Sequence, residues 1–207
     1  LSSSASQMVN APISANVVLS ESTSNFHAND ITTVNATVTG FAGSGASYSF
    51  TLTPLAKLDK AQGLFSAVVG AGTFADATGN TNTNSNTLTR TYDSVGPTVT
   101  LISDALPIVN DPITVYVALS ESSDNFEVGD ITTVNATVSG FAGSLSNYSF
   151  TLTPQVETSN AQGLFYVSVN AGVFTDAAGN GNAASNILSR TYDNRNTITV
   201  ITPNGGE

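Results

Sequence analysis

Short runs in which apolar and polar residues alternate recur along the whole chain. Apolar side chains occupy every second position from Ile113 to Leu119, from Tyr148 to Leu152 and from Phe165 to Val169. A period of two residues places one face of a strand in a core and the other in solvent. Segments rich in Gly, Asn and Asp separate these runs, and none shows helical periodicity. The pattern predicts an all-β chain built from short antiparallel strands.

The chain also repeats itself. Residues 11–93 match residues 111–193 at a constant offset of 100 and without a gap, with about three in five positions identical. A unit of this length is typical of a self-contained domain rather than of a solenoid repeat. We therefore predict one domain over 1–96 and a second over 97–196. Residues 197–207 are expected to be the start of a further module or a tail strand.

About seven strands in ~100 residues are typical of an antiparallel β-sandwich of the immunoglobulin type. The predicted strands of the second copy are Pro97–Ile102, Ile113–Ser120, a strand with a short companion within Ile131–Gly140, Tyr148–Thr153, Leu164–Val169 and Ser185–Tyr192. The first copy should lack part of its first strand, because Leu1 aligns with Leu101. Four core positions are predicted to be buried in both copies: Phe50 and Phe150, Leu52 and Leu152, Phe65 and Phe165, and Phe74 and Phe174.

Several motifs, taken in order, resemble the bacterial Ig-like repeats of large surface proteins and adhesins. They are Pro97-Thr-Val-Thr-Leu101, Val117-Ala-Leu-Ser-Glu121, Gly129-Asp-Ile131, Phe174-Thr-Asp-Ala-Ala-Gly-Asn180 and Ser189-Arg-Thr-Tyr-Asp193. The resemblance covers essentially the whole chain. It implies two tandem immunoglobulin-like sandwiches in an extracellular, cell-surface protein, arranged in arrays that in some cases hold calcium at domain junctions. It does not imply an enzyme.

Charge and composition argue against several classes of binding partner and of catalytic site. The chain has 15 Asp and Glu against 5 Lys and Arg, giving a net charge of -10. That excess disfavours nucleic acid and anionic membranes as partners, and no apolar run is long enough for a membrane span. The single imidazole, His27, has Glu127 as its counterpart, and there is no Cys. A catalytic triad or a zinc site is therefore not expected, and His27 is interpreted as a solvated loop residue.

Metal binding remains the best candidate chemistry. In a sandwich of this topology, the loop after the second strand and the loop before the last strand meet the linker Asp93–Pro97 at one end of the domain. Oxygen ligands in these segments suit Ca²⁺, which takes 6–8 of them. The predicted ligands are Asp93, Glu121, Asp124, Asp130, Asp176 and Asn180. The alternative is that these are ordinary turn residues, with Asp130 bonding its own loop.

The sequence is consistent with three hypotheses about the function. The first is a non-catalytic spacer or stalk of an adhesin-like protein, with neighbouring repeats of the same protein as its partners. The second is a module that binds carbohydrate or protein, which should carry a patch present in one copy only. The third is a subunit of a filament or surface layer, in which residues 197–207 of one chain add a strand to the next by head-to-tail association.

Overall fold

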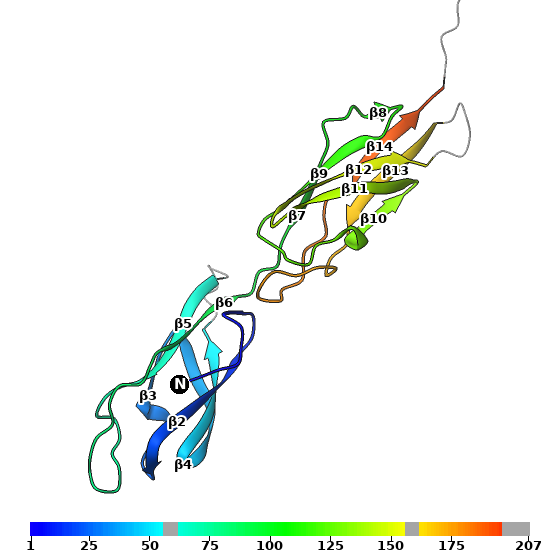
Figure 1. Ribbon diagram of the computed structural model, residues 1–207. Helices are drawn as coiled ribbons and strands as arrows, with labels where there is room; N and C mark the ends of the chain where they lie inside the picture. The colour runs from blue at the N-terminus through cyan, green and yellow to red at the C-terminus, as the bar shows by residue number, and fades with distance from the viewer. Residues whose placement is uncertain (56–61, 156–161, 196–207) are drawn as a thin grey trace, which may run out of the picture. The chain divides into compact units, whose positions relative to one another are not determined.

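The computed structural model describes residues 1–55, 62–155 and 162–195, which form two compact units (Figure 1). Unit 1 comprises Leu1–Gly96 together with Ala177–Asn180, and unit 2 comprises Pro97–Asp176 together with Gly181–Glu207. The predicted tail segment 197–207 lies outside the described residues. Within the described residues, no helix is long and apolar enough to span a membrane.

Unit 2 consists of two four-stranded sheets. The first sheet has the order β11 (Ala136–Ser144), β12 (Asn147–Pro154), β9 (Ile113–Leu119) and β7 (Val99–Ile102), with all neighbours antiparallel. The second has the order β10 (Ile131–Val134), β13 (Gln162–Val169), β14 (Leu188–Asp193) and β8 (Ile108–Val109). The short β8 pairs parallel to the last strand, β14. The only helical element described in unit 2 is the 3-10 turn Val128–Asp130.

Unit 1 repeats this arrangement with two differences. Its second sheet has the order β1 (Met8–Val9), β6 (Leu88–Asp93), β5 (Gln62–Val69) and β3 (Ile31–Val34), and β1 again runs parallel to the last strand. In its first sheet, β2 (Ile13–Thr23) pairs with β4 (Ala36–Pro54), a continuous strand over positions that form two strands in unit 2. A single bridge, between Ser2 and Asn16, takes the place of β7. A 3-10 turn spans Ala28–Asp30. The predicted pair of immunoglobulin-like sandwiches is confirmed.

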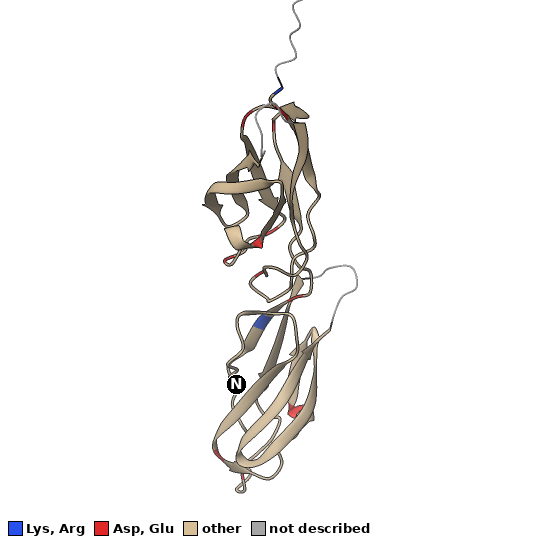
Figure 2. Ribbon diagram, turned by 90° about the vertical axis from the view of Figure 1, so that its right-hand side faces the viewer, with Lys and Arg blue, Asp and Glu red and all other residues tan. Residues whose placement is uncertain are grey.

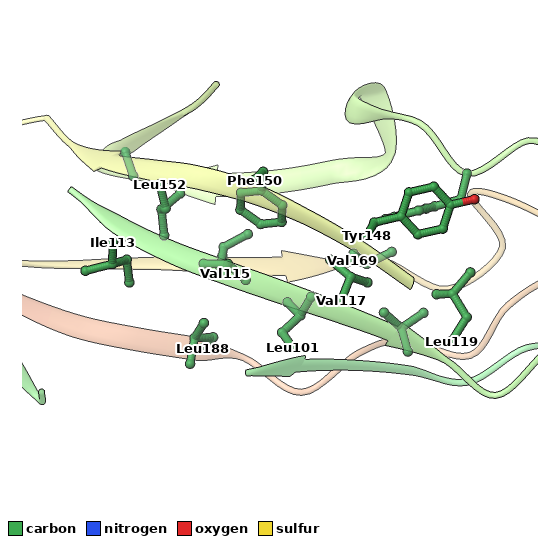
Figure 3. Packing of buried hydrophobic residues seen from close by; sticks show 14 of the residues in the cluster. Leu101, Ile113, Val115, Val117, Leu119, Tyr148, Phe150, Leu152, Val169 and Leu188 are labelled. Atoms are coloured by element: carbon green, nitrogen blue, oxygen red, sulfur yellow. The ribbon is translucent and has the colours of Figure 1, made fainter. Parts of the chain in front are cut away.

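The core of each unit lies between its two sheets, as Figure 3 shows for unit 2. Phe150 and Phe165 are at most 2% exposed, and so are their counterparts Phe50 and Phe65. Phe174 is buried as predicted, but the prediction for Phe74 is wrong: it is only partly buried. Phe74 differs because it lines a groove at the end of unit 1.

The strand predictions hold with three corrections. The region Ile131–Gly140 holds the predicted strand and its short companion, which meet at Asn135 with a positive φ of 53°, but the strand continues to Ser144 as β11. The two-residue β8 was not predicted, because two residues are too short to show a period. The last strand begins at Leu188 rather than Ser185, since the side chain of Asn186 is bonded to the first strand. Its Oδ1 accepts from the Leu101 amide at 2.8 Å, and its Nδ2 donates to the Leu101 carbonyl at 2.9 Å.

Buried polar side chains fix the long loop before the last strand. In unit 2, the Oδ1 of Asn182 accepts from the amides of Val173 and Phe174 at 2.9 and 3.1 Å. Its Nδ2 donates to the carbonyls of Asn170 and Ala183, both at 2.8 Å. Asn82 organises the loop of unit 1 through equivalent bonds. The loop that carries Asp176 is therefore held by the sandwich.

Candidate metal centre

Two loops at the same end of unit 2 carry five of the six predicted ligands. The first loop, residues 120–130, follows β9 and contains Glu121, Asp124 and Asp130. The second, residues 170–187, precedes β14 and contains Asp176 and Asn180, although Asn180 is grouped with unit 1. The hydrogen bond from Ser123 Oγ to the Thr175 carbonyl, at 2.8 Å, ties the two loops together. Acidic residues lie mainly in loops, while the strands of both units carry few charges (Figure 2).

Glu121 and Asp176 are brought together by these loops. One carboxylate oxygen of each lies within 4.8 Å of the other. Asp176 is only 7% exposed, and Glu121 is half-buried. Two carboxylates at this spacing repel one another unless a cation or hydrogen-bond donors lie between them. The donor set is hard oxygen, which suits Ca²⁺ or Mg²⁺ rather than a transition metal.

Asp124 and Asp130 do not belong to this pair. Asp130 Oδ2 accepts from the Glu127 amide at 2.9 Å and so caps the turn Val128–Asp130, which is the alternative foreseen from the sequence. Asp124 is exposed. The pKa of Tyr148 is raised, first because burial disfavours the phenolate and second because Asp124 is nearby. In the described parts of the chain, neither carboxylate joins a group of metal-ligating atoms.

Asp93 and Asn180 are assigned to unit 1. Asp93 is fully buried at the end of β6, where Gln62 Nε2 donates to its Oδ2 and the Val95 amide donates to its Oδ1 at 3.1 Å. Asn180 Nδ2 donates to the Asp93 carbonyl at 3.1 Å, and Asn180 Oδ1 accepts from Asn10 at 3.2 Å. The site of six ligands stays a prediction.

In the equivalent loops of unit 1, the carboxylate that corresponds to Asp176 is hydrogen-bonded within its own loop. Asp76, the counterpart of Asp176, lines a groove of about 330 Å³ together with Glu21 and Asn80. Its Oδ1 accepts from the amide and hydroxyl of Thr78 and from the Asn80 amide, and its Oδ2 accepts from Asn80 Nδ2, all at 2.8–2.9 Å. Hydrogen bonds from Asn80 are the largest cause that lowers the pKa of Asp76, to about 2. Both carboxylate oxygens of Asp76 therefore accept hydrogen bonds within the loop, and these bonds favour the charged form.

Two other sequence features have structural roles. His27 is exposed, as expected, and its amide donates to Asp30 Oδ2 at 2.7 Å. Asn35 and Asn135 each begin a triplet that fits the N-glycosylation pattern, but their Nδ2 atoms donate to the carbonyls of Leu64 and Leu164 at 2.8 and 2.9 Å. The nitrogen that would carry a glycan is thus bonded to the backbone of β5 in unit 1 and of β13 in unit 2. The third triplet, at Asn147, begins on an exposed residue.

Comparison with known proteins gives one family. The bacterial Ig-like domain matches the chain twice, over residues 2–92 and 93–192. Among solved structures, a pair of tandem Ig domains of titin is similar at 10% identity, covering 90% of this chain and 89% of that one, with a TM-score of 0.23. No curated protein matches the chain.

Proposed function

Because the chain belongs to the bacterial Ig-like domain family, we propose that it is a load-bearing spacer of an extracellular, adhesin-like surface protein. Domains of such families are generally non-catalytic and typically occur in extracellular or surface proteins. A spacer needs repeated units that fold alike and resist extension from their ends. The proposal therefore depends on how the terminal strands of each repeat are joined.

The observation that carries the proposal is the parallel pairing of the last strand of each unit with the two-residue strand near the start of that unit. In unit 2, Thr191 and Tyr192 of β14 lie in register with Ile108 and Val109 of β8. Tension applied at the two ends of the unit pulls these parallel neighbours in opposite directions along their length. The hydrogen bonds between them are then loaded together in shear rather than one after another. The same pairing joins β1 and β6 in unit 1.

An arginine strengthens this connection in both repeats. Arg190 Nε donates to the Ala105 carbonyl at 3.1 Å, and its Nη2 donates to the Ser103 carbonyl at 3.2 Å. Arg90 makes the same two bonds, to Ala5 and Ser3, at 3.2 Å. Each guanidinium thereby fastens the last strand to the segment that leads into the parallel pair. Charge-assisted bonds of this kind are stronger than bonds between neutral groups.

Single-molecule force spectroscopy tests the spacer function. The chain should unfold in two events, each lengthening it by roughly 30 nm, because about 90 residues extend at up to 3.6 Å each. Replacing Arg190 with Lys should lower the unfolding force of one event and leave the other unchanged. Replacing Arg90 should affect the other event. Unfolding without distinct force peaks, or forces unaffected by both replacements, would contradict a load-bearing role.

We also propose Ca²⁺ as the ligand of the loop end of unit 2. The Glu121–Asp176 pair supports the proposal, since two close carboxylates supply the charge such an ion requires. Calorimetric titration with CaCl₂ should give binding that Glu121→Gln and Asp176→Asn both weaken at least tenfold. Asp124→Asn is the matched control and should bind as the parent does. Asp93→Asn decides whether the linker carboxylate takes part. Equal heats for the parent and the double variant Glu121→Gln, Asp176→Asn would refute calcium binding there.

A further inference from the structure

The two repeats differ sharply where the first strand crosses from one sheet to the other. In unit 2 this crossover, residues 103–107, lies beside a groove of about 450 Å³ that we call the crossover groove. Its lining includes Asp104, Leu106, Ile108, Asp111 and Tyr116. The counterparts of these residues in unit 1 are Ser4, Ser6, Met8, Ala11 and Asn16. Four of the five exchanges thus add an apolar side chain or a carboxylate to unit 2.

These side chains are presented to solvent rather than packed. Leu106 is 74% exposed, Ile108 58% and Tyr116 44%. Ile102, 53% exposed, pairs directly with Tyr116 across β7 and β9 and extends the apolar surface along the outer face of the sheet. The position equivalent to Ile102 is Ser2 in unit 1. An exposed apolar surface of this kind costs solubility and is typical of an interaction site.

The backbone below the groove is the same in both repeats. Ser103 Oγ donates to the Thr114 carbonyl at 2.6 Å, and Ser3 Oγ donates to the Ser14 carbonyl at the same distance. The arginine bonds to the crossover, described above, are also shared. Structural need therefore does not explain the apolar and acidic side chains of unit 2, because unit 1 builds the same crossover with serines. The difference lies in what the surface presents.

We propose that the crossover groove of unit 2 binds a polypeptide segment that carries a Lys or Arg beside an aliphatic side chain. Apart from Tyr116, the apolar residues that line the groove are aliphatic. Such a lining suits a Leu, Ile or Val side chain better than a sugar ring. Asp104 and Asp111 are exposed, and neither has an ion-pair partner among the described residues. Two carboxylates at the groove complement a cation at close range.

Charge also indicates that the segment comes from another protein. This chain has 5 Lys and Arg against 15 Asp and Glu, so a second copy offers few cations and repels the groove at long range. Adding a strand to the free edge of β7 is blocked, because the side chain of Asn186 already bonds both backbone groups of Leu101. The groove would therefore recognise side chains rather than extend the sheet. This binding role goes beyond the proposed spacer function and does not depend on it.

The test uses the whole chain and a library of twelve-residue peptides with the central sequence Leu-Xaa-Lys. A matched library has Leu-Xaa-Glu, and a glycan array is probed in parallel. We expect selected Lys peptides to bind at least tenfold more tightly than their Glu counterparts, and to weaken as NaCl rises from about 50 to 500 mM. The variant Leu106→Ser, Tyr116→Asn, which restores the unit 1 residues, should lose at least tenfold in affinity.

The reverse graft supplies a gain-of-function control. Introducing Ser4→Asp, Ser6→Leu, Ala11→Asp and Asn16→Tyr into unit 1 should add a second binding site, so that the stoichiometry rises from one peptide per chain to two. No selectivity for Lys over Glu, or an affinity unchanged in the Leu106→Ser, Tyr116→Asn variant, would overturn the proposal. Binding of glycans alone, or self-association that this variant abolishes, would assign the groove to another occupant and would also overturn it.

Discussion

Replacing Asn182 with Ala should destabilise the second repeat far more than its modest change in volume suggests. Asn182 is 3% exposed, and its amide makes four hydrogen bonds to the backbone of the loop before β14. Each bond contributes about 0.5–1.5 kcal/mol net, and a donor or acceptor left buried without a partner costs more. Water can replace some of the lost bonds at the loop surface. We therefore expect the free energy of unfolding of the second repeat to fall by about 3 kcal/mol, which lowers the melting temperature of a domain this size by roughly 12–24 °C.

Differential scanning calorimetry of the whole chain measures the shift, and hydrogen exchange of peptides unique to each repeat identifies the domain that melts. Asn84→Ala is the matched control. Its Oδ1 accepts a single exposed bond, from the Ala71 amide at 2.7 Å, and the second repeat already has Ala184 at that position. Asn84→Ala should lower the free energy of unfolding by less than about 1 kcal/mol. If Asn182→Ala costs no more than Asn84→Ala, the four bonds do not organise the loop and our reasoning fails.

Two further predictions concern a turn and a carboxylate. In Gly143→Ala, the new Cβ would lie 2.3 Å from the Asn147 carbonyl oxygen, and the backbone φ at this position is +135°. We therefore expect urea denaturation to show that the free energy of unfolding falls by about 3 kcal/mol or more. The control Gly163→Ala, which has open space around it, should be neutral or slightly stabilising. Asp76 should titrate with a pKa of about 2 by carbon-detected NMR. Because this folded-state pKa lies below the ordinary value of 3.8, its contribution to stability is complete above about pH 4 and is lost as the pH falls towards 2. A measured pKa near 4 would show that the bonds from Asn80 and Thr78 do not persist in solution.

The class of fold could be predicted from the amino-acid sequence, because the alternation and the repeat are visible in the order of residues alone. The alternation around Val115 and Val117 predicted β9 and its buried face, and the offset of 100 predicted two like domains. The two loops that carry Glu121 and Asp176 were also predicted, since the order of strands in an immunoglobulin-like sandwich places them at one end.

The three-dimensional structure was needed to tell which polar side chains are hydrogen-bonded to the backbone and which are exposed for binding. Asp130 matched the ligand pattern as well as Asp176 did, but it caps its own turn, which is a question of distances within a loop. The structural roles of Asn182 and Arg190 were not predicted, because their partners lie on other segments of the chain. The crossover groove left its trace in the sequence as exchanges between the repeats, among them Ser6 and Asn16 for Leu106 and Tyr116. That trace acquires meaning only when burial shows that both new side chains face solvent, since apolar residues more often signal a core.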